Sequence, residues 1–205
     1  MAFSSQVPKL YNTKVKYSIA ERLFARQFAS GYNRGMKMVL DGKPNGKMDE
    51  FSSPTKGRVN MSSMISDISE FVDDDPSGFY RLIIGTDSQT RRVNGKVEID
   101  YVTALVIYRK GKGARYFWKK VKVFQKPILR DKIYTETLLS LEAAQKIVPE
   151  VRKVISPAKY DFEIHIDVGP LGPTRDMIRE VVGMVNGNGF VAKTKPESWG
   201  ASSVA

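Results

Sequence analysis

Cysteine is absent from this chain of 205 residues, and histidine occurs only once, at His165. The missing thiols exclude disulfides, thiolate catalysis and zinc sites built on cysteine. A ribonuclease mechanism that uses two histidines as acid and base is excluded as well. The chemistry of the protein is therefore expected to rest on carboxylates, hydroxyls and cations.

Long apolar runs are also missing. No stretch approaches the roughly 20 apolar residues of a membrane span, and residues 1–17 lack the apolar segment of a signal peptide. These absences favour a cytoplasmic protein with no membrane partner. The chain is instead rich in positive charge, because 33 Lys and Arg residues against 22 Asp and Glu residues give a net charge of +11. Such an excess favours a polyanionic partner, most often nucleic acid.

The first 60 residues differ in composition from the rest. They are basic and interrupted by Gly, Pro and Ser, which predicts an N-terminal arm. Within the arm, residues 18–31 begin with a capping-box pattern and predict one helix. Residues 41–58 are dominated by turn-forming residues and predict a long loop or flexible linker. Residues 61–205 are expected to form the folded domain.

The hydrophobic pattern of this domain predicts a mixed α/β fold. Residues 61–72 place their apolar side chains on one helical face. Three stretches of period-two alternation, joined by short turns, predict an antiparallel meander at residues 79–87, 97–108 and 114–124. The pattern then predicts a helix at 130–148 that is interrupted at Pro149, with residues 150–155 as its continuation. After it come a strand at 160–169, a helix at 174–189 with Thr174 as N-cap, a strand at 190–195 and a final helix opened by 196–205. The expected sheet is mixed and has five strands.

Carboxylates stand at two strand ends of this scheme. Asp87 follows "LIIGT" and Asp167 follows "IHI", and a glycine-bearing segment accompanies each. A strand that follows a crossover helix lies parallel to its neighbour, so both acids are expected at one edge of the sheet. Two neighbouring anions repel unless they share a proton or a cation, and a hard divalent metal would relieve that repulsion. Taken singly, each aspartate also suits an ordinary turn.

A third acid is expected from the helix after the meander. Glu136 lies in its first turns and can reach the sheet edge, whereas Glu142 points to another side. Glu197 in "KPES" is a candidate fourth acid. The alternative for Glu136 is an exposed helix residue, and for Glu197 a charge that suits a helix N-terminus.

Four segments in this order resemble the ribonuclease H-like superfamily: "IGTDSQ", "TET", "HIDVG" with its "GPT" continuation, and "KPESWGASSVA". The closest resemblance is to the bacterial YkuK-type branch of predicted ribonuclease H-related nucleases, over about residues 62–205. It implies a metal-dependent nuclease in which one or two Mg²⁺ or Mn²⁺ ions are held by Asp87, Glu136 and Asp167. Relatives place a further acid in the last helix. This chain leaves three alternatives: Glu197 takes the place of that further acid, the position has been lost, or no fourth acid is needed.

Two polar residues flank the predicted acids. Ser88 follows Asp87, and His165 precedes Asp167 by two residues and so shares its side of the strand. Both are candidates for contact with a phosphate or with water. The alternative for His165 is a hydrogen-bonded, partly buried histidine.

The third meander strand predicts a nucleic-acid-binding face. Between Arg109 and Lys132 the chain has ten Lys or Arg residues and one acid. Aromatic and cationic side chains alternate on one side of this strand, which suits base stacking and phosphate neutralisation. The alternative is an edge strand that lysines protect from aggregation. The candidate nucleic-acid-binding residues are Arg91, Arg92, Trp118, Lys120 and Lys122.

Three functions from different classes follow. The first is hydrolysis of nucleic-acid phosphodiesters with Mg²⁺ or Mn²⁺ as cofactor. The second is a binding module that keeps the fold and the basic face but cleaves nothing, and the third is a scaffold whose N-terminal arm recruits a protein partner. ATPases of the sugar-kinase and actin type share this sheet topology, but they need two such domains, for which the chain is too short.

Overall fold

The structure, a computed structural model, describes residues 38–40, 50–124, 128–200 and 202–203. The strands are β1 (Met38–Leu40), β2 (Glu50–Ser53), β3 (Gly57–Asn60), β4 (Tyr80–Val93), β5 (Lys96–Arg109), β6 (Gly113–Val123), β7 (Tyr160–His165) and β8 (Val191–Lys193). The helices are α2 (Met61–Asp73), α3 (Leu129–Val154) and α4 (Ile178–Gly187), with 3₁₀ turns at Pro157–Lys159 and Arg175–Met177. The helix predicted at 18–31 lies outside the described residues.

One mixed sheet holds all of these strands, in the order β3-β2-β6-β5-β4-β7-β8, and β1 pairs with β6. The central strands β4, β5 and β6 are antiparallel, as the meander prediction requires. Strand β7 runs parallel to β4, and β8 runs parallel to β7. The predicted ribonuclease H-like arrangement is thus confirmed, and β1, β2 and β3 extend the five expected strands to eight.

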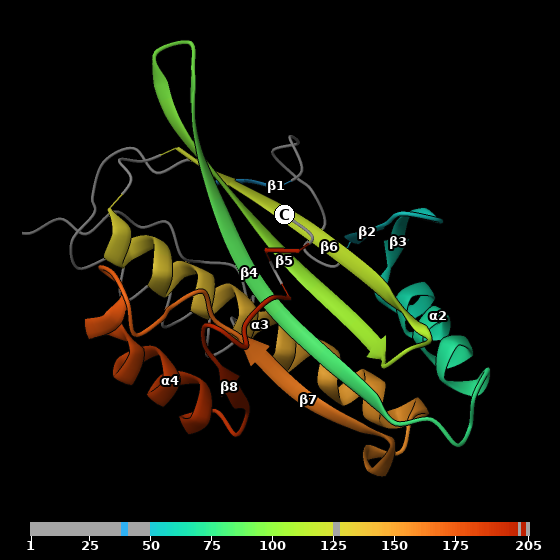
Figure 1. Ribbon diagram of the computed structural model, residues 1–205. Coiled ribbons are helices and arrows are strands. Elements are labelled where there is room, and N and C mark those ends of the chain that lie inside the picture. The colour runs from blue at the N-terminus through green and yellow to red at the C-terminus, as the bar shows by residue number, and fades with distance from the viewer. Residues whose placement is uncertain (1–37, 41–49, 125–127, 201, 204–205) are drawn as a thin grey trace, which may run out of the picture.

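The long β4–β5 hairpin protrudes beyond the rest of the sheet (Figure 1). It turns at Asn94 and Gly95, whose φ angles of 51° and 76° are both positive. A two-residue hairpin turn with two positive φ angles matches the twist of its strands, and Asn-Gly is the pair that adopts it most readily. The hairpin gives β4 fourteen residues, more than the predicted strand at 79–87.

The linker interpretation of residues 41–58 is wrong for residues 50–58. Strands β2 and β3 pair with each other there, and β2 pairs with β6 through Ser52 and Trp118. Although this segment has few apolar residues, Phe51 and Val59 are 3% and 7% exposed. Burial of these two side chains offsets the weak strand tendency of the surrounding turn residues. The end of the N-terminal arm therefore contributes to the sheet.

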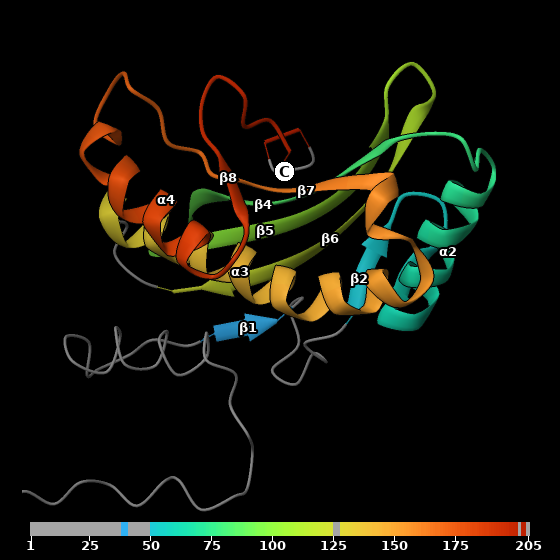
Figure 2. The same cartoon turned by 90° about the horizontal axis from the view of Figure 1, so that it is seen from below.

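The helices cover one face of the sheet (Figure 2). Alternate residues of the central strands, such as Leu82 and Ile84, pack there against Leu141 and Ile147 of α3 in one buried cluster. Helix α3 continues without a break through Pro149, so the predicted interruption is wrong. The proline removes one backbone hydrogen bond, while Val148 and the neighbouring apolar residues stay buried against the sheet. None of the helices in the described ranges has the length and apolar character of a membrane span.

The opposite face carries the segment after β8, and this segment corrects another prediction. Residues 196–200 and 202–203 form turns and irregular backbone, not the expected final helix. The backbone N–H groups of Trp199 and Gly200 both donate to Nδ1 of His165, at 3.1 Å each. Gly200 lies so close to the sheet that a Cβ atom on it would be 2.6 Å from Cγ2 of Ile83. These contacts hold the segment against the sheet at Trp199 and Gly200.

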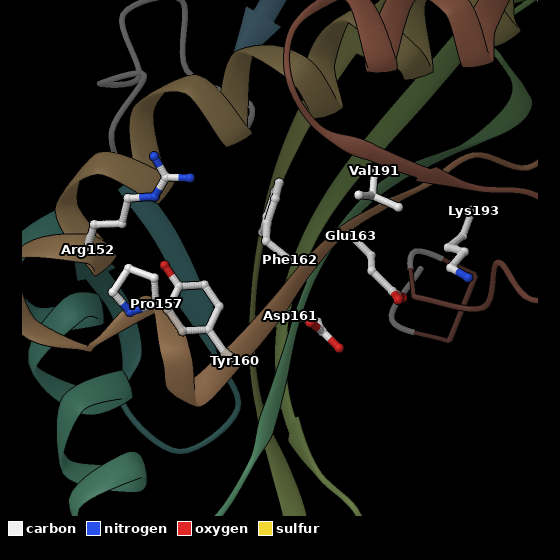
Figure 3. A pocket seen from close by; sticks show the side chains of 8 residues that line it. All are labelled: Arg152, Pro157, Tyr160, Asp161, Phe162, Glu163, Val191 and Lys193. Carbon is white, nitrogen blue, oxygen red and sulfur yellow. The ribbon is translucent and has the colours of Figure 1, made fainter.

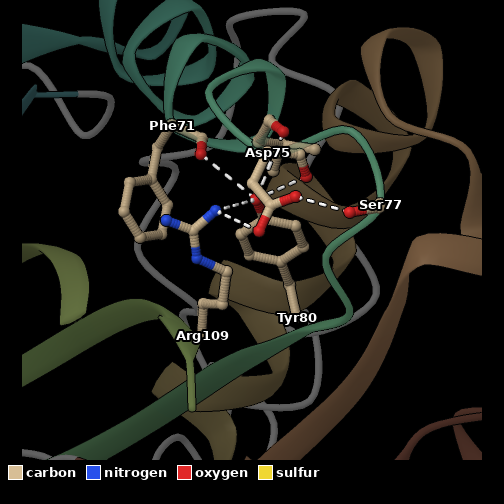
Figure 4. A network of polar contacts seen from close by, with 6 residues as sticks. Phe71, Asp75, Ser77, Tyr80 and Arg109 are labelled. Carbon is tan, nitrogen blue, oxygen red and sulfur yellow. Dashed lines mark hydrogen bonds and ion pairs between the residues drawn. The ribbon is translucent and has the colours of Figure 1, made fainter. Parts of the chain in front are cut away.

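A polar network fastens α2 to the end of the sheet that lies away from the carboxyl end of β7 (Figure 4). Arg109 of β5 forms an ion pair of 3.0 Å with Asp75 and donates a hydrogen bond to the hydroxyl of Tyr80. That hydroxyl also contacts the backbone carbonyl of Phe71, at 3.3 Å. The Arg109 guanidinium lies 5.5 Å from the centre of the Phe71 ring. The hydrogen bond from Ser77 and the Arg109 charge lower the pKa of Asp75.

Candidate active site

The register between β4 and β7 places two aspartates side by side. The last parallel pair of these strands is Gly85 and His165. Asp87 lies two residues after Gly85, and Asp167 lies two residues after His165. Both aspartates therefore stand at the carboxyl edge of β7, as predicted. Asp87 does not end its strand, however, because β4 continues along β5 and Asp87 pairs with Val102. The turn interpretation of Asp87 is therefore wrong.

The third predicted acid, Glu136, extends from α3 toward the same edge. It is 4% exposed, and its Oε1 accepts a hydrogen bond of 2.5 Å from the hydroxyl of Ser88. Its Oε2 is buried and has no hydrogen-bond partner among the described residues. Burial, together with the charges of Asp87 and Asp167, raises the pKa of Glu136 to about 8, against the Ser88 hydrogen bond and the Lys132 charge, which lower it.

A cavity of about 290 Å³ brings the three acids together. Two lysines share its wall, and Lys195 forms an ion pair of 2.7 Å with Oδ1 of Asp167. Its remaining wall is apolar apart from Ser88 and Thr174. The lining residues are Asp87, Ser88, Leu129, Lys132, Ile133, Glu136, Asp167, Leu171, Pro173, Thr174 and Lys195.

The loop after Asp167 forms one side of this cavity. Thr174, predicted as an N-cap, instead accepts a hydrogen bond of 3.2 Å from the backbone N–H of Gly169. Its side chain makes no capping bond, and a 3₁₀ turn precedes α4. The threonine therefore closes the loop and leaves Leu171 at its tip, 88% exposed.

The donor set of this cavity fits a hard divalent cation. Carboxylate oxygens are the ligands that Mg²⁺ and Mn²⁺ prefer, and Glu136 offers a buried oxygen that has no partner in the described part of the chain. A cation would also offset the charges of Asp87 and Asp167, which add to burial in raising the pKa of Glu136. As the side chains stand in the described ranges, no three His, Asp or Glu residues are grouped closely enough to hold an ion. The contacts of Asp167 with Lys195 and of Glu136 with Ser88 take up one oxygen of each carboxylate.

Glu197 and His165 lie apart from this cavity. Glu197 is exposed and forms an ion pair of 2.9 Å with Lys193, so the structure does not bring it to the three acids. His165 is buried, with its Nε2 3.2 Å from Oε2 of Glu163 and its Nδ1 accepting two backbone N–H groups. Burial lowers the pKa of His165, which keeps the ring neutral as these bonds require. The structure supports the hydrogen-bonded alternative for this histidine.

The predicted nucleic-acid-binding face has internal partners for much of its charge. Lys122 forms an ion pair of 2.7 Å with Glu98, and Lys120 lies 3.6 Å from Asp100. Arg91 also contacts Asp100, and both acids belong to the neighbouring strand β5. Glu98 and Asp100 are 5% and 2% exposed. The cations therefore neutralise buried carboxylates.

The remainder of this face is aromatic, and its strand is not an edge. Trp118 stacks on Tyr116 with ring centroids 5.8 Å apart and an interplanar angle of 28°. Strand β6 pairs with β5 on one side and with β1 and β2 on the other, so the edge-protection alternative is wrong. Arg92 is exposed near the tip of the β4–β5 hairpin, away from the acid cavity.

Sequence reasoning missed the two lysines of the site. Lys195 lies two residues after Lys193, the last residue of β8, which is parallel to β7, so it emerges at the same sheet edge as Asp167. The rule that identified the acids would have identified Lys195 if it had been applied to every residue at that edge. Lys132 lies one turn before Glu136 on α3, where its i,i+4 spacing places it on the same helix face.

A second cavity, of about 350 Å³, lies beside β7 and β8 (Figure 3). Arg152 and Lys193 lie at its two ends, with Asp161 and Glu163 between them. Glu163 is paired with His165, and Lys193 is paired with Glu197. Its two acids lie between its two cations, and Glu163 and Lys193 are already paired, so the acid cavity is the better candidate for a ligand site.

Comparison with known proteins agrees with this geometry. The model of the "Ribonuclease H-like" family matches residues 63–205. The chain is also similar to the uncharacterized protein YkuK of Bacillus subtilis (strain 168), with 35% identity over 168 residues that cover 76% of this chain and 94% of that protein. No solved structure matches the chain. With its mixed sheet, its three acids at one strand edge and this family match, the chain belongs to the ribonuclease H-like family.

Proposed function

We propose that this protein is a nuclease that hydrolyses phosphodiester bonds of nucleic acid with the help of Mg²⁺ or Mn²⁺. The observation that supports this most strongly is the cavity in which Asp87, Glu136 and Asp167 meet, where one Glu136 oxygen is buried and has no partner among the residues that the structure describes. Family membership supports a nucleic-acid-related function of the same kind.

Asp87, Glu136 and Asp167 would hold the metal. When bound, such a cation supplies Lewis-acid stabilisation of the phosphate and lowers the pKa of a water molecule. Ser88 fixes the orientation of Glu136 through its hydrogen bond to Oε1, so that the buried Oε2 is left for a ligand. Metal-assisted hydrolysis of this kind needs no side-chain nucleophile, which is consistent with a chain that has no cysteine.

The lysines of the cavity supply the charge that a phosphate backbone requires. Lys132 and Lys195 stand on the wall that bears the carboxylates, so a phosphodiester brought to the acids would meet ammonium groups there. Leu129 and Leu171 are exposed on the same wall and offer apolar contact to sugars or bases. Trp118, stacked on Tyr116, is a proposed base-stacking residue farther along the sheet.

A second function is favoured by one observation. The ion pair between Lys195 and Asp167 already neutralises one of the acids, as a site that binds nucleic acid without cleaving it would allow. A non-catalytic module would keep the family fold and the excess of positive charge but would take up no metal. The scaffold function rests on the N-terminal arm, most of which lies outside the described residues.

A cleavage panel separates these functions. Labelled single-stranded DNA, duplex DNA, RNA, RNA–DNA hybrid and branched DNA would each be incubated with Mg²⁺, with Mn²⁺ or with EDTA. We expect at least one substrate class to be cleaved with metal and left intact in EDTA. Binding of these substrates without cleavage of any of them would favour the non-catalytic module.

A further inference from the structure

Lys195 is held at the acid cavity by its backbone. The pairing of β7 with β8 continues past the ends of both strands, because Ile166 N–H donates to the carbonyl of Lys193 at 2.9 Å. The N–H of Lys195 then donates to the carbonyl of Val168 at 2.8 Å. This ladder brings Lys195 beside Asp167.

The neighbouring loop is shaped to admit the lysine side chain. A Cβ atom placed on Gly169 would lie 3.0 Å from Cβ of Lys195, closer than side chains normally pack. Glycine at this position therefore allows the loop to pass directly against the lysine. The Lys195 Nζ reaches Oδ1 of Asp167 at 2.7 Å, and the two side chains are 55% and 34% exposed at the cavity.

This arrangement differs from an ordinary surface ion pair in its location. The acid partner is one of the three candidate metal ligands, so Lys195 and a divalent cation would compete for the same carboxylate. An ammonium group carries three donors and no acceptor, and its flexible stem lets it turn to another anion nearby. The anion that a nuclease brings into this cavity is a phosphate.

We propose that Lys195 is a phosphate-binding residue of the site, whose ammonium neutralises Asp167 until a divalent cation takes that carboxylate. The lysine then contacts a non-bridging oxygen of the nucleic-acid backbone. This inference rests on the proposed nuclease function and adds a residue to its substrate-binding machinery. It assigns one residue two effects of opposite sign, since Lys195 opposes metal binding and supports nucleic-acid binding.

Lys195→Met and Lys195→Arg test the inference. The first keeps most of the side-chain length and removes the charge, and the second keeps the charge. Lys153→Met is the matched control, because Lys153 forms a similar ion pair, of 2.7 Å with Glu150, near the far end of α3. All three variants are expected to fold, since each changed side chain is at least half exposed.

The first readout is Mn²⁺ affinity by calorimetric titration without nucleic acid. Loss of a competing ion pair at a partly exposed site should tighten Mn²⁺ binding by about two- to fivefold in Lys195→Met. The control should match wild type. Unchanged or weaker Mn²⁺ binding in Lys195→Met would overturn the inference, because a purely structural ion pair would give that result.

The second readout is binding of a non-cleavable nucleic acid at several salt concentrations in the presence of Mn²⁺. Lys195→Met should reduce the slope of log affinity against log salt by about 0.7–0.9, the amount expected for one lost phosphate contact. Lys195→Arg should keep the wild-type slope, and so should the control. An unchanged slope in Lys195→Met would also overturn the inference.

The failures of the two proposals can be told apart in the same experiment. If wild type takes up no Mn²⁺, with or without the non-cleavable nucleic acid, the nuclease function fails and this inference fails with it. If wild type binds both ligands and Lys195→Met behaves like wild type, only the inference about Lys195 fails.

Discussion

The hydroxyl of Ser88 on β4 donates a hydrogen bond to Oε1 of Glu136 on α3, at 2.5 Å. This bond joins two residues 48 positions apart and satisfies one of the two carboxyl oxygens. The other oxygen, Oε2, is buried without a partner in the described part of the chain. Glu136 is thus a buried acid held in place by one hydrogen bond, and the following two predictions depend on it.

The stability of the metal-free protein should fall as pH rises toward 8. The pKa of Glu136 is about 8 in the folded protein and near 4.5 when the chain is unfolded, so the folded state binds the proton more tightly. The resulting stabilisation is fully present below pH 4.5 and is lost as pH rises through 8. Melting temperatures measured in EDTA across this range should show the decline in wild type and a weaker decline in Glu136→Gln. Equal pH profiles for the two proteins would contradict the assignment of this pH dependence to Glu136.

Metal uptake should show the opposite pH dependence, because a cation and a proton compete for Glu136. Millimolar Mn²⁺ should raise the melting temperature more at pH 8 than at pH 6. Glu136→Gln should weaken this shift, whereas Glu142→Gln should not, since Glu142 is paired with Lys146 and lies outside the cavity. A melting temperature that ignores Mn²⁺ and Mg²⁺, even with a non-cleavable nucleic acid present, would favour the non-catalytic module.

Lys122 should contribute to stability through its ion pair with Glu98. Lys122→Met leaves a carboxylate that is 5% exposed without its cation, and we expect a loss of about 1–3 kcal/mol in the free energy of unfolding. Adding Glu98→Gln should recover part of that loss, as chemical denaturation of the double mutant can show. If Lys122→Met keeps full stability but reduces the salt dependence of nucleic-acid binding, the lysine belongs to the nucleic-acid-binding face after all.

Gly200 should be required for the C-terminal segment to lie on the sheet. A Cβ atom there would be 2.6 Å from Ile83, so Gly200→Ala must displace either the segment or the isoleucine. We expect a lower melting temperature and faster proteolysis near the C-terminus. Gly183→Ala is the control, because its Cβ would meet nothing within 4 Å and alanine favours a helix. Equal melting temperatures for Gly200→Ala and wild type would contradict this packing.

Local signals in the sequence predicted much of the fold. Asn94-Gly95 marks the β4–β5 hairpin because that pair readily adopts two positive φ angles. The apolar face of α2 follows from its helical periodicity, and Asn60 caps the helix through a bond of 2.8 Å to Ser63 N–H. Strands β2 and β3 could not be predicted in this way. They depend on the pairing of β2 with β6, which lies far away in the sequence.

The positions of the two aspartates could be predicted because the sheet topology alone determines them. Asp87 and Asp167 come together because parallel neighbours share a carboxyl edge. The ion pairs of Lys120 and Lys122 with Asp100 and Glu98 required the register between β5 and β6, which alternation along a single strand does not contain. The final helix was wrongly predicted because His165 holds the backbone there, and no local pattern records that contact.

The central claim is that the three acids support metal-dependent cleavage of nucleic acid. Cleavage by the Asp87→Asn variant tests this claim most directly. The amide keeps the shape of the side chain but lacks the anionic oxygen that a hard cation requires. Any substrate cleaved by wild type in the panel would be incubated with this variant and with Glu142→Gln under the same Mn²⁺ concentration. We expect Asp87→Asn to lose at least about a hundredfold in rate while melting near or above wild type, because one repulsive charge has been removed. A folded Asp87→Asn protein that cleaves at the wild-type rate would contradict the account.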